Sequence, residues 1–138
     1  MTKKRHKIGI FVSVVLVVTL LFSMTAFASW YGWSSATFST SLTGQWRKYD
    51  GNNVGLNWGS NTHNSMPNHV NNSAGFNISL QRRGFLGTWS TVGTYKASRK
   101  GAGSATWTNV GSGTYRFYFS KANDGTTEYV TDIEMYSW

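Results

Sequence analysis

Five carboxylates are the only acidic side chains in this chain of 138 residues, and they are the first candidates for catalysis. Three of them, Glu128, Asp132 and Glu134, lie on one predicted strand at separations of four and two positions, and even separations place them on one face because successive strand side chains alternate. The other two are Asp50 and Asp124. A glycosidase needs two carboxyl groups that face each other across a cleft, whereas neighbours on one strand are typical of a solvated, charge-paired sheet face. No serine lies in a nucleophile-elbow motif either, so the sequence predicts a protein that is not an enzyme.

Two histidines, His63 and His69, lie in a long polar stretch, residues 59–75, and are the candidates for a metal site. Zinc sites use three or four ligands with supporting hydrogen bonds, but the chain has no cysteine and the nearest acid in sequence, Asp50, is remote. The Asn-Asp-Gly sequence at 123–125 lacks the later acidic ligands of a calcium loop and favours a turn. We therefore expect no metal and no cofactor, and the polar stretch is either a functional loop or a mobile one.

Seven tryptophans and seven tyrosines make aromatic rings the most distinctive feature of the sequence. A buried indole needs space and a hydrogen-bond partner for its N–H, so a small domain encloses only some of them. Trp89 and Trp107 lie within strand patterns and are expected in the core. The rings expected at the surface, where exposed aromatics mark binding sites, are Trp30, Tyr31, Trp33, Trp46 and Trp138. Trp30 and Trp33 are the leading candidates, because no strand needs either of them on its inward face.

Basic residues occur as adjacent pairs beside predicted turns, so we expect them at the ends of the domain; the pairs are Arg47-Lys48, Arg82-Arg83 and Arg99-Lys100. Such pairs either maintain solubility or contact polyanions such as teichoic acids, lipid headgroups and acidic glycans. The residues predicted to form a binding surface combine rings and cations: Trp30, Tyr31, Trp33, Trp46, Arg47, Lys48, Arg82 and Arg83.

The first 28 residues have the three parts of a secretory signal peptide. Four basic residues between positions 3 and 7 precede an apolar run over residues 8–22, and Ala-Phe-Ala at 26–28 supplies a cleavage site. An uncleaved membrane anchor is the alternative, but a spanning helix needs about 20 apolar residues. We therefore expect cleavage after Ala28 and a secreted domain of residues 29–138, whose nine basic and five acidic residues give a net charge of +4. The absence of cysteine favours a Gram-positive bacterial source.

Apolar residues in 29–138 recur at every second position, which is typical of half-buried strands. The pattern is strongest at 54–58, 76–80 and 115–119, and further strands are expected around 33–42, 88–96, 104–110 and 127–137. About seven short strands separated by turn residues predict an all-β fold, a single antiparallel β-sandwich. The turn at 123–125 further predicts a hairpin, in which Phe119 lies opposite Tyr129 and Arg116 lies opposite Asp132.

A tight corner at 110–115, Val-Gly-Ser-Gly-Thr-Tyr, opens one of these strands. Over residues 104–129 the chain resembles the turn and penultimate strand of immunoglobulin-like β-sandwiches, here of the kind expected in small secreted bacterial proteins. The resemblance implies that the hydroxyl of Tyr115 bonds the backbone upstream of it. The Cys-Trp-Cys core of antibody domains is absent, so the resemblance carries the architecture and implies no function.

Two functions agree with a small, basic, ring-rich exported domain. The first is non-catalytic binding of a cell-surface or envelope polymer through exposed aromatics and basic residues. The second is that of a secreted antimicrobial protein acting on bacterial envelopes, because the composition is broadly similar to that of bacteriocins. A protease inhibitor is a third possibility without positive support. The expected partner is an anionic polymer or membrane surface rather than a nucleic acid, and the oligomeric state is left open.

Overall fold

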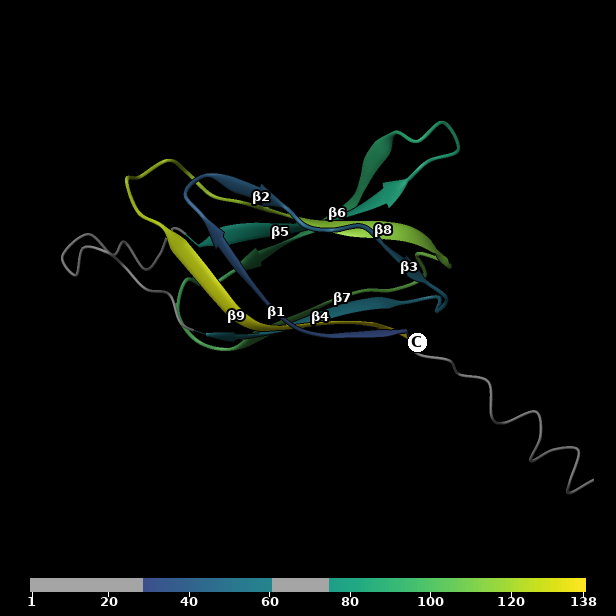
Figure 1. The fold of residues 1–138 in the computed structure, drawn as a ribbon, viewed down its shortest axis with the longest axis horizontal. Coiled ribbons are helices and arrows are strands. Elements are labelled where there is room, and N and C mark those ends of the chain that lie inside the picture. Colours follow the sequence, from purple (N-terminus) through teal and green to yellow (C-terminus); the bar gives the residue numbers. More distant parts are fainter. Residues whose placement is uncertain (1–28, 61–74) are drawn as a thin grey trace, which may run out of the picture.

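Nine β-strands and no helix form residues 29–60 and 75–138, the part of the chain described by the structure, a computed structural model. The strands are β1 (Trp30–Phe38), β2 (Ser41–Thr43), β3 (Arg47–Tyr49), β4 (Val54–Ser60), β5 (Phe76–Arg83), β6 (Trp89–Ala97), β7 (Gly103–Trp107), β8 (Gly113–Ser120) and β9 (Glu128–Ser137). One antiparallel sheet has the order β1-β9-β4-β7, and the other has the order β2-β8-β5-β6, with β3 also pairing with β8. Figure 1 shows the sheets stacked as two layers, which confirms the predicted all-β sandwich.

Most connections carry the chain from one sheet to the other. Among the described strands, only β5 and β6 are both consecutive in sequence and paired with each other. The predicted hairpin at 123–125 is therefore wrong, because β8 and β9 belong to different sheets and Phe119 pairs with Leu42 and Ile78 instead of Tyr129. In immunoglobulin domains the last two strands share a sheet. The structure thus carries the sandwich architecture without the immunoglobulin strand order.

The core between the sheets is built largely from aromatic rings. Phe38 packs edge-on against Phe76 with ring centroids 5.8 Å apart, and Trp107 packs against Phe117 at 5.7 Å. Both Trp107 and Phe117 are buried, as the alternation predicted. Offset and edge-to-face pairs of this kind add to the stabilisation that buried area alone provides, which suits a domain that has no disulfide.

A bulge in β6 explains why one predicted core residue lies outside. Gly93 pairs with Leu80 but Thr91 pairs with Gln81, so Val92 is an extra residue that reverses the direction of the side chains before it. Trp89 consequently shares the outer face with its partner Arg83 and is only half-buried. The prediction of Trp89 as a core residue is wrong because a bulge shifts the alternation by one position.

A second bulge, in β9, separates carboxylates that the alternation placed together. Asp132 and Ile133 stand opposite the single residue Trp58, and Asp132 has a φ of 52°. Glu128, before the bulge, points inward and is 1% exposed. Glu134, after it, faces outward and accepts a hydrogen bond from Nδ2 of Asn57 at 3.5 Å. The prediction that Glu128, Asp132 and Glu134 share one solvated face is therefore wrong.

The corner before β8 has the contact that the immunoglobulin resemblance implied. The buried Tyr115 hydroxyl lies 2.6 Å from the carbonyl oxygen of Val110 and 2.7 Å from that of Gly111, to either of which it donates. Gly111 has a φ of 75°, a conformation that side chains other than glycine rarely adopt. The ring of Tyr115 also packs edge-on against Tyr49, with centroids 6.0 Å apart. The contact ties the corner to the core.

Some expectations fall on residues that the structure does not describe. The expected signal peptide, residues 1–28, and the two histidines, His63 and His69, are among them. Within the described residues, no helix is long and apolar enough to cross a bilayer.

Candidate functional site

The outer face of the β2-β8-β5-β6 sheet carries two tryptophans, each beside an arginine. The guanidinium carbon of Arg116 lies 4.2 Å from the ring centroid of Trp89, and that of Arg83 lies 6.0 Å from the ring centroid of Trp46. These four residues, Trp46, Arg83, Trp89 and Arg116, are called the aromatic–arginine face below. Both distances fall within the range of cation–π attraction, about 6 Å.

Strand register assembles the aromatic–arginine face from segments that are far apart in sequence. β8 lies between β3 and β5, and Gln81 pairs with Arg116 across the β5–β8 ladder. Nε of Arg116 donates a hydrogen bond to Oε1 of Gln81 at 2.8 Å, which holds the guanidinium over the ring of Trp89. Trp46, in the short gap between β2 and β3, is 60% exposed. A planar guanidinium can stack on an aromatic ring and still present donors that match the geometry of carboxylate and phosphate groups.

The β5–β6 hairpin ends in an apolar tip. Its turn is closed by hydrogen bonds from the Gly84 amide to the Thr88 carbonyl at 2.7 Å and from the Gly87 amide to the Gly84 carbonyl at 3.0 Å. Phe85 and Leu86, at the tip, are 102% and 83% exposed. Figure 1 shows this teal hairpin projecting away from the rest of the sandwich. Phe85 and Leu86 were not among the residues predicted to bind, although an apolar pair between two glycines and after Arg82-Arg83 is a signal visible in the sequence.

The predicted N-terminal rings do not belong to this surface. Trp30 pairs with Tyr136, which places it on the outer face of the opposite sheet, where it is 57% exposed. Trp138, at 42% exposure, stacks on Tyr136 with ring centroids 5.4 Å apart. Trp33 lies in β1, and its side chain is outside the described part of the structure. The predicted binding residues are thus divided between the two sides of the sandwich.

Tyr31 and Arg47 lie between the sheets rather than on an outer face. The Tyr31 hydroxyl donates to the carbonyl oxygen of Lys48 at 2.6 Å, and its ring packs edge-on against Tyr49 at 5.3 Å. The guanidinium carbon of Arg47 lies 4.7 Å from the centroid of the Tyr31 ring. Lys48 is exposed, with Nζ 4.0 Å from Oδ1 of Asp50. Of the three predicted binding residues Tyr31, Arg47 and Lys48, Lys48 alone is exposed to solvent.

The two arginines of the predicted pair Arg82-Arg83 have different surroundings. Arg82 donates from Nη1 to the Val110 carbonyl at 2.9 Å and from Nη2 to the Ser112 carbonyl at 3.1 Å. These bonds hold the corner that precedes β8. Arg83 faces outward toward Trp46, so Arg83 is the member of the pair that belongs to the aromatic–arginine face.

A buried ionic cluster occupies one end of the sandwich, where the sequence predicted only an exposed basic pair. Lys100 is exposed, but Arg99 is 2% exposed and its Nη1 lies 2.6 Å from Oδ2 of Asp124. Nε of Arg99 donates to the Gly75 carbonyl at 3.2 Å and lies 3.8 Å from Oε2 of Glu128. Arg99 thus connects the β6–β7 loop to the starts of β5 and β9.

The two carboxylates of this cluster have opposite pKa shifts. A hydrogen bond from Nζ of Lys121, at 2.7 Å, is the largest of several contacts that hold the pKa of Asp124 well below its usual range, with Thr126 and Arg99 adding to it. Burial raises the pKa of Glu128, and the charge of Arg99 opposes that shift. The contacts of Asp124 therefore stabilise its ionised form, whereas burial destabilises the ionised form of Glu128.

Glu128→Gln is expected to raise the free energy of unfolding at pH 7, with a gain that shrinks as the pH falls toward the ordinary pKa of 4.5. A carboxyl group whose pKa is raised by folding destabilises the native state once it ionises, and the penalty disappears where both states are protonated. Urea midpoints measured between pH 4.5 and 7 test this, because Asp124 stays ionised throughout that range. If Glu128→Gln instead becomes less stable than the wild type as the pH rises, the charge of Glu128 stabilises the native state through its pairing with Arg99.

No protein-family model and no curated protein matches the chain. Within the described residues, no three His, Cys, Asp or Glu side chains are grouped as metal ligands.

Proposed function

We propose that this chain is a secreted, non-catalytic binding protein that recognises an anionic polymer of a bacterial envelope through the aromatic–arginine face. The observation that carries the proposal is the pairing of Trp46 with Arg83 and of Trp89 with Arg116 on one outer face. Flat rings offer stacking surface at a low cost in conformational entropy, and guanidinium groups bind phosphate and carboxylate in bidentate geometry. The net charge of +4 in residues 29–138 attracts the same class of polymer.

Replacing both Trp46 and Trp89 with alanine is expected to weaken binding to isolated Gram-positive cell walls about tenfold or more. A ring contact contributes about 0.5–1.5 kcal/mol beyond its buried area, and about 1.4 kcal/mol is a factor of ten in affinity. Cosedimentation with the walls measures the loss. The matched control is Trp30→Ala with Trp138→Ala, which removes two exposed rings from the opposite sheet and leaves binding unchanged. Equal losses from the two double variants would contradict the assignment of the surface.

The charge contribution is tested in the same assay. Arg83→Glu is expected to weaken binding at low salt and to have less effect near physiological salt, where screening acts over about 8 Å. Walls stripped of teichoic acid provide the matched ligand control. If removal of teichoic acid leaves binding to the walls unchanged, the ligand is the neutral glycan rather than the anionic polymer.

Action on membranes is the second candidate, and the exposed tip of Phe85 and Leu86 is the observation that favours it. An apolar tip beside basic residues fits the interface of an anionic bilayer. Phe85→Ser with Leu86→Ser is therefore expected to abolish any dye release from phosphatidylglycerol vesicles while leaving wall binding intact. If the wild type releases dye and this variant also loses wall binding, the antimicrobial function replaces the polymer-binding one.

A further inference from the structure

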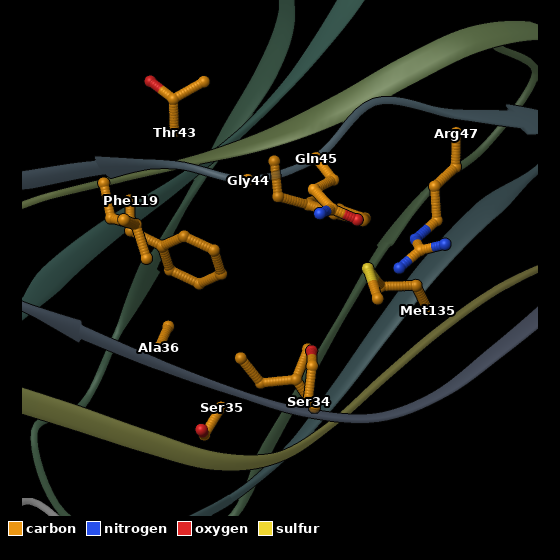
Figure 2. A pocket seen from close by; sticks show the side chains of 12 residues that line it. Ser34, Ser35, Ala36, Thr43, Gly44, Gln45, Arg47, Phe119 and Met135 are labelled. Atoms are coloured by element: carbon orange, nitrogen blue, oxygen red, sulfur yellow. The ribbon is translucent and has the colours of Figure 1, made fainter.

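An apolar cleft of about 350 Å³ opens between the two sheets on the side where β1 faces β2 and β3. Its inner wall consists of core side chains from both sheets, among them Phe117, Phe119, Ile133 and Met135. Figure 2 shows Phe119 and Ala36 at one end and the Arg47 side chain reaching toward Met135 at the other. The cleft is separate from the aromatic–arginine face, which lies on the outside of one sheet.

Irregularities in the strands at two sheet edges, β1 in one sheet and β2 and β3 in the other, leave this side of the sandwich uncovered by the described side chains. The ladder between β1 and β9 shifts register on both sides of Ser34, and β2 and β3 are separated by residues 44–46. The Gly44 amide donates to the Phe117 carbonyl at 2.8 Å, so the gap lies directly against β8. Small residues at the rim, Ser34, Ser35 and Gly44, place little side-chain volume over the core. The cleft is thus a consequence of edge geometry rather than of loose packing.

Among the described residues that line the cleft, Arg47 has the one charged side chain and none is a carboxylate. Nε of Arg47 is buried without a hydrogen-bond partner among the described residues. The ion pairs of the described residues involve Lys48, Arg99 and Lys121, not Arg47. A half-buried cation without a counter-charge is costly, and an anion that enters the cleft relieves that cost.

We propose that the cleft binds a free alkyl carboxylate, with the chain against Phe117, Phe119, Ile133 and Met135 and the carboxylate hydrogen-bonded to the guanidinium of Arg47. The fork of donors on a guanidinium matches the two oxygens of a carboxylate. Ligand sites range from about 300 to 1,000 Å³, and a cleft at the lower end of that range suits a single chain of medium length. An apolar wall with one cation at its end matches this amphipathic shape.

Decanoate is the probe, observed by NMR in the purified chain with labelled Ile, Leu and Met methyl groups. Saturable shifts are expected at Met135 and Ile133 in the cleft and none at Leu86, the exposed reporter on the hairpin tip. Arg47→Gln is expected to lower the affinity for decanoate about tenfold or more, because hydrogen bonds to charged groups are stronger than those between neutral groups. Decanol, which has the same chain without the charge, binds more weakly and is unaffected by Arg47→Gln.

Two further variants complete the test. Lys48→Gln removes the same charge from the next residue, outside the cleft, and leaves decanoate affinity unchanged. Ser34→Trp places a large ring at the exposed rim and abolishes binding of decanoate and decanol alike. The proposal is overturned if decanoate shifts Leu86 as much as Met135, if Arg47→Gln and Lys48→Gln have equal effects, or if Ser34→Trp still binds.

Discussion

Phe117→Ala is expected to lower the free energy of unfolding by about 3–5 kcal/mol, the range for removing a large buried ring. Phe117 is 2% exposed, pairs with Leu80 of the neighbouring strand β5 and packs against Trp107. Alanine in its place removes transfer free energy and also leaves a void that the surrounding β-strands fill only partly. A domain of this size has about 5–15 kcal/mol of total stability, so the variant approaches the limit of folding.

Urea-induced unfolding followed by tryptophan fluorescence measures this loss. Tyr118→Ala is the matched control, because Tyr118 is the next residue of β8 and faces outward with partial exposure. The control is expected to cost clearly less than Phe117→Ala. Equal midpoints for the two variants would mean that the inward face of β8 has been assigned to the wrong residues.

Arg99→Met is expected to destabilise the domain by about 3–5 kcal/mol, the range for removing one partner of a buried ion pair. Methionine fills much of the same volume but leaves Glu128 buried without its counter-charge and the Gly75 carbonyl without its donor. Asp124, which is partly exposed, loses its 2.6 Å contact as well. The loss comes chiefly from the uncompensated charge of Glu128 rather than from packing.

Lys100→Met is the matched control for Arg99→Met, because it removes the same charge from the adjacent exposed position and is expected to change stability little. Combining Arg99→Met with Glu128→Gln separates charge from packing. Glu128→Gln is expected to stabilise the Arg99→Met variant by more than it stabilises the wild type, a non-additivity that a double-mutant cycle measures. Equal gains in the two backgrounds would show that the charge of Glu128 does not interact with Arg99.

The two-layer fold was predictable because alternation of apolar side chains is a local property. Leu56, Ile78 and Phe117 each lie on an apolar repeat of period two, and all three are buried. A half-buried strand shows its inward face in its own residues, whichever strand lies beside it. The contact of Tyr115 with the corner before β8 was predictable for a similar reason, since its partners are four and five residues away.

Bulges and cross-sheet connections were not predictable from the same pattern. The extra residues at Val92 and Asp132 reverse the alternation within β6 and β9, which moved Trp89 outward and Glu128 inward. The turn at 123–125 is real, with Gly125 at a φ of 75°, but it leads to the other sheet. A turn limits local direction, whereas the choice of partner strand depends on burial throughout the sandwich.

The sequence by itself therefore determined an all-β domain with an aromatic core and more rings than that core can enclose. Only the tertiary structure decided which rings meet which cations: Trp46 joins Arg83, Trp89 joins Arg116, and Trp30 lies on the opposite sheet. The tertiary structure also decided that the Arg47 side chain lines a cleft and that Arg99 is buried in an ionic cluster. The physical reason is that side-chain chemistry and alternation are properties of one strand, while a surface or a cleft is formed by several strands whose pairing no single segment specifies.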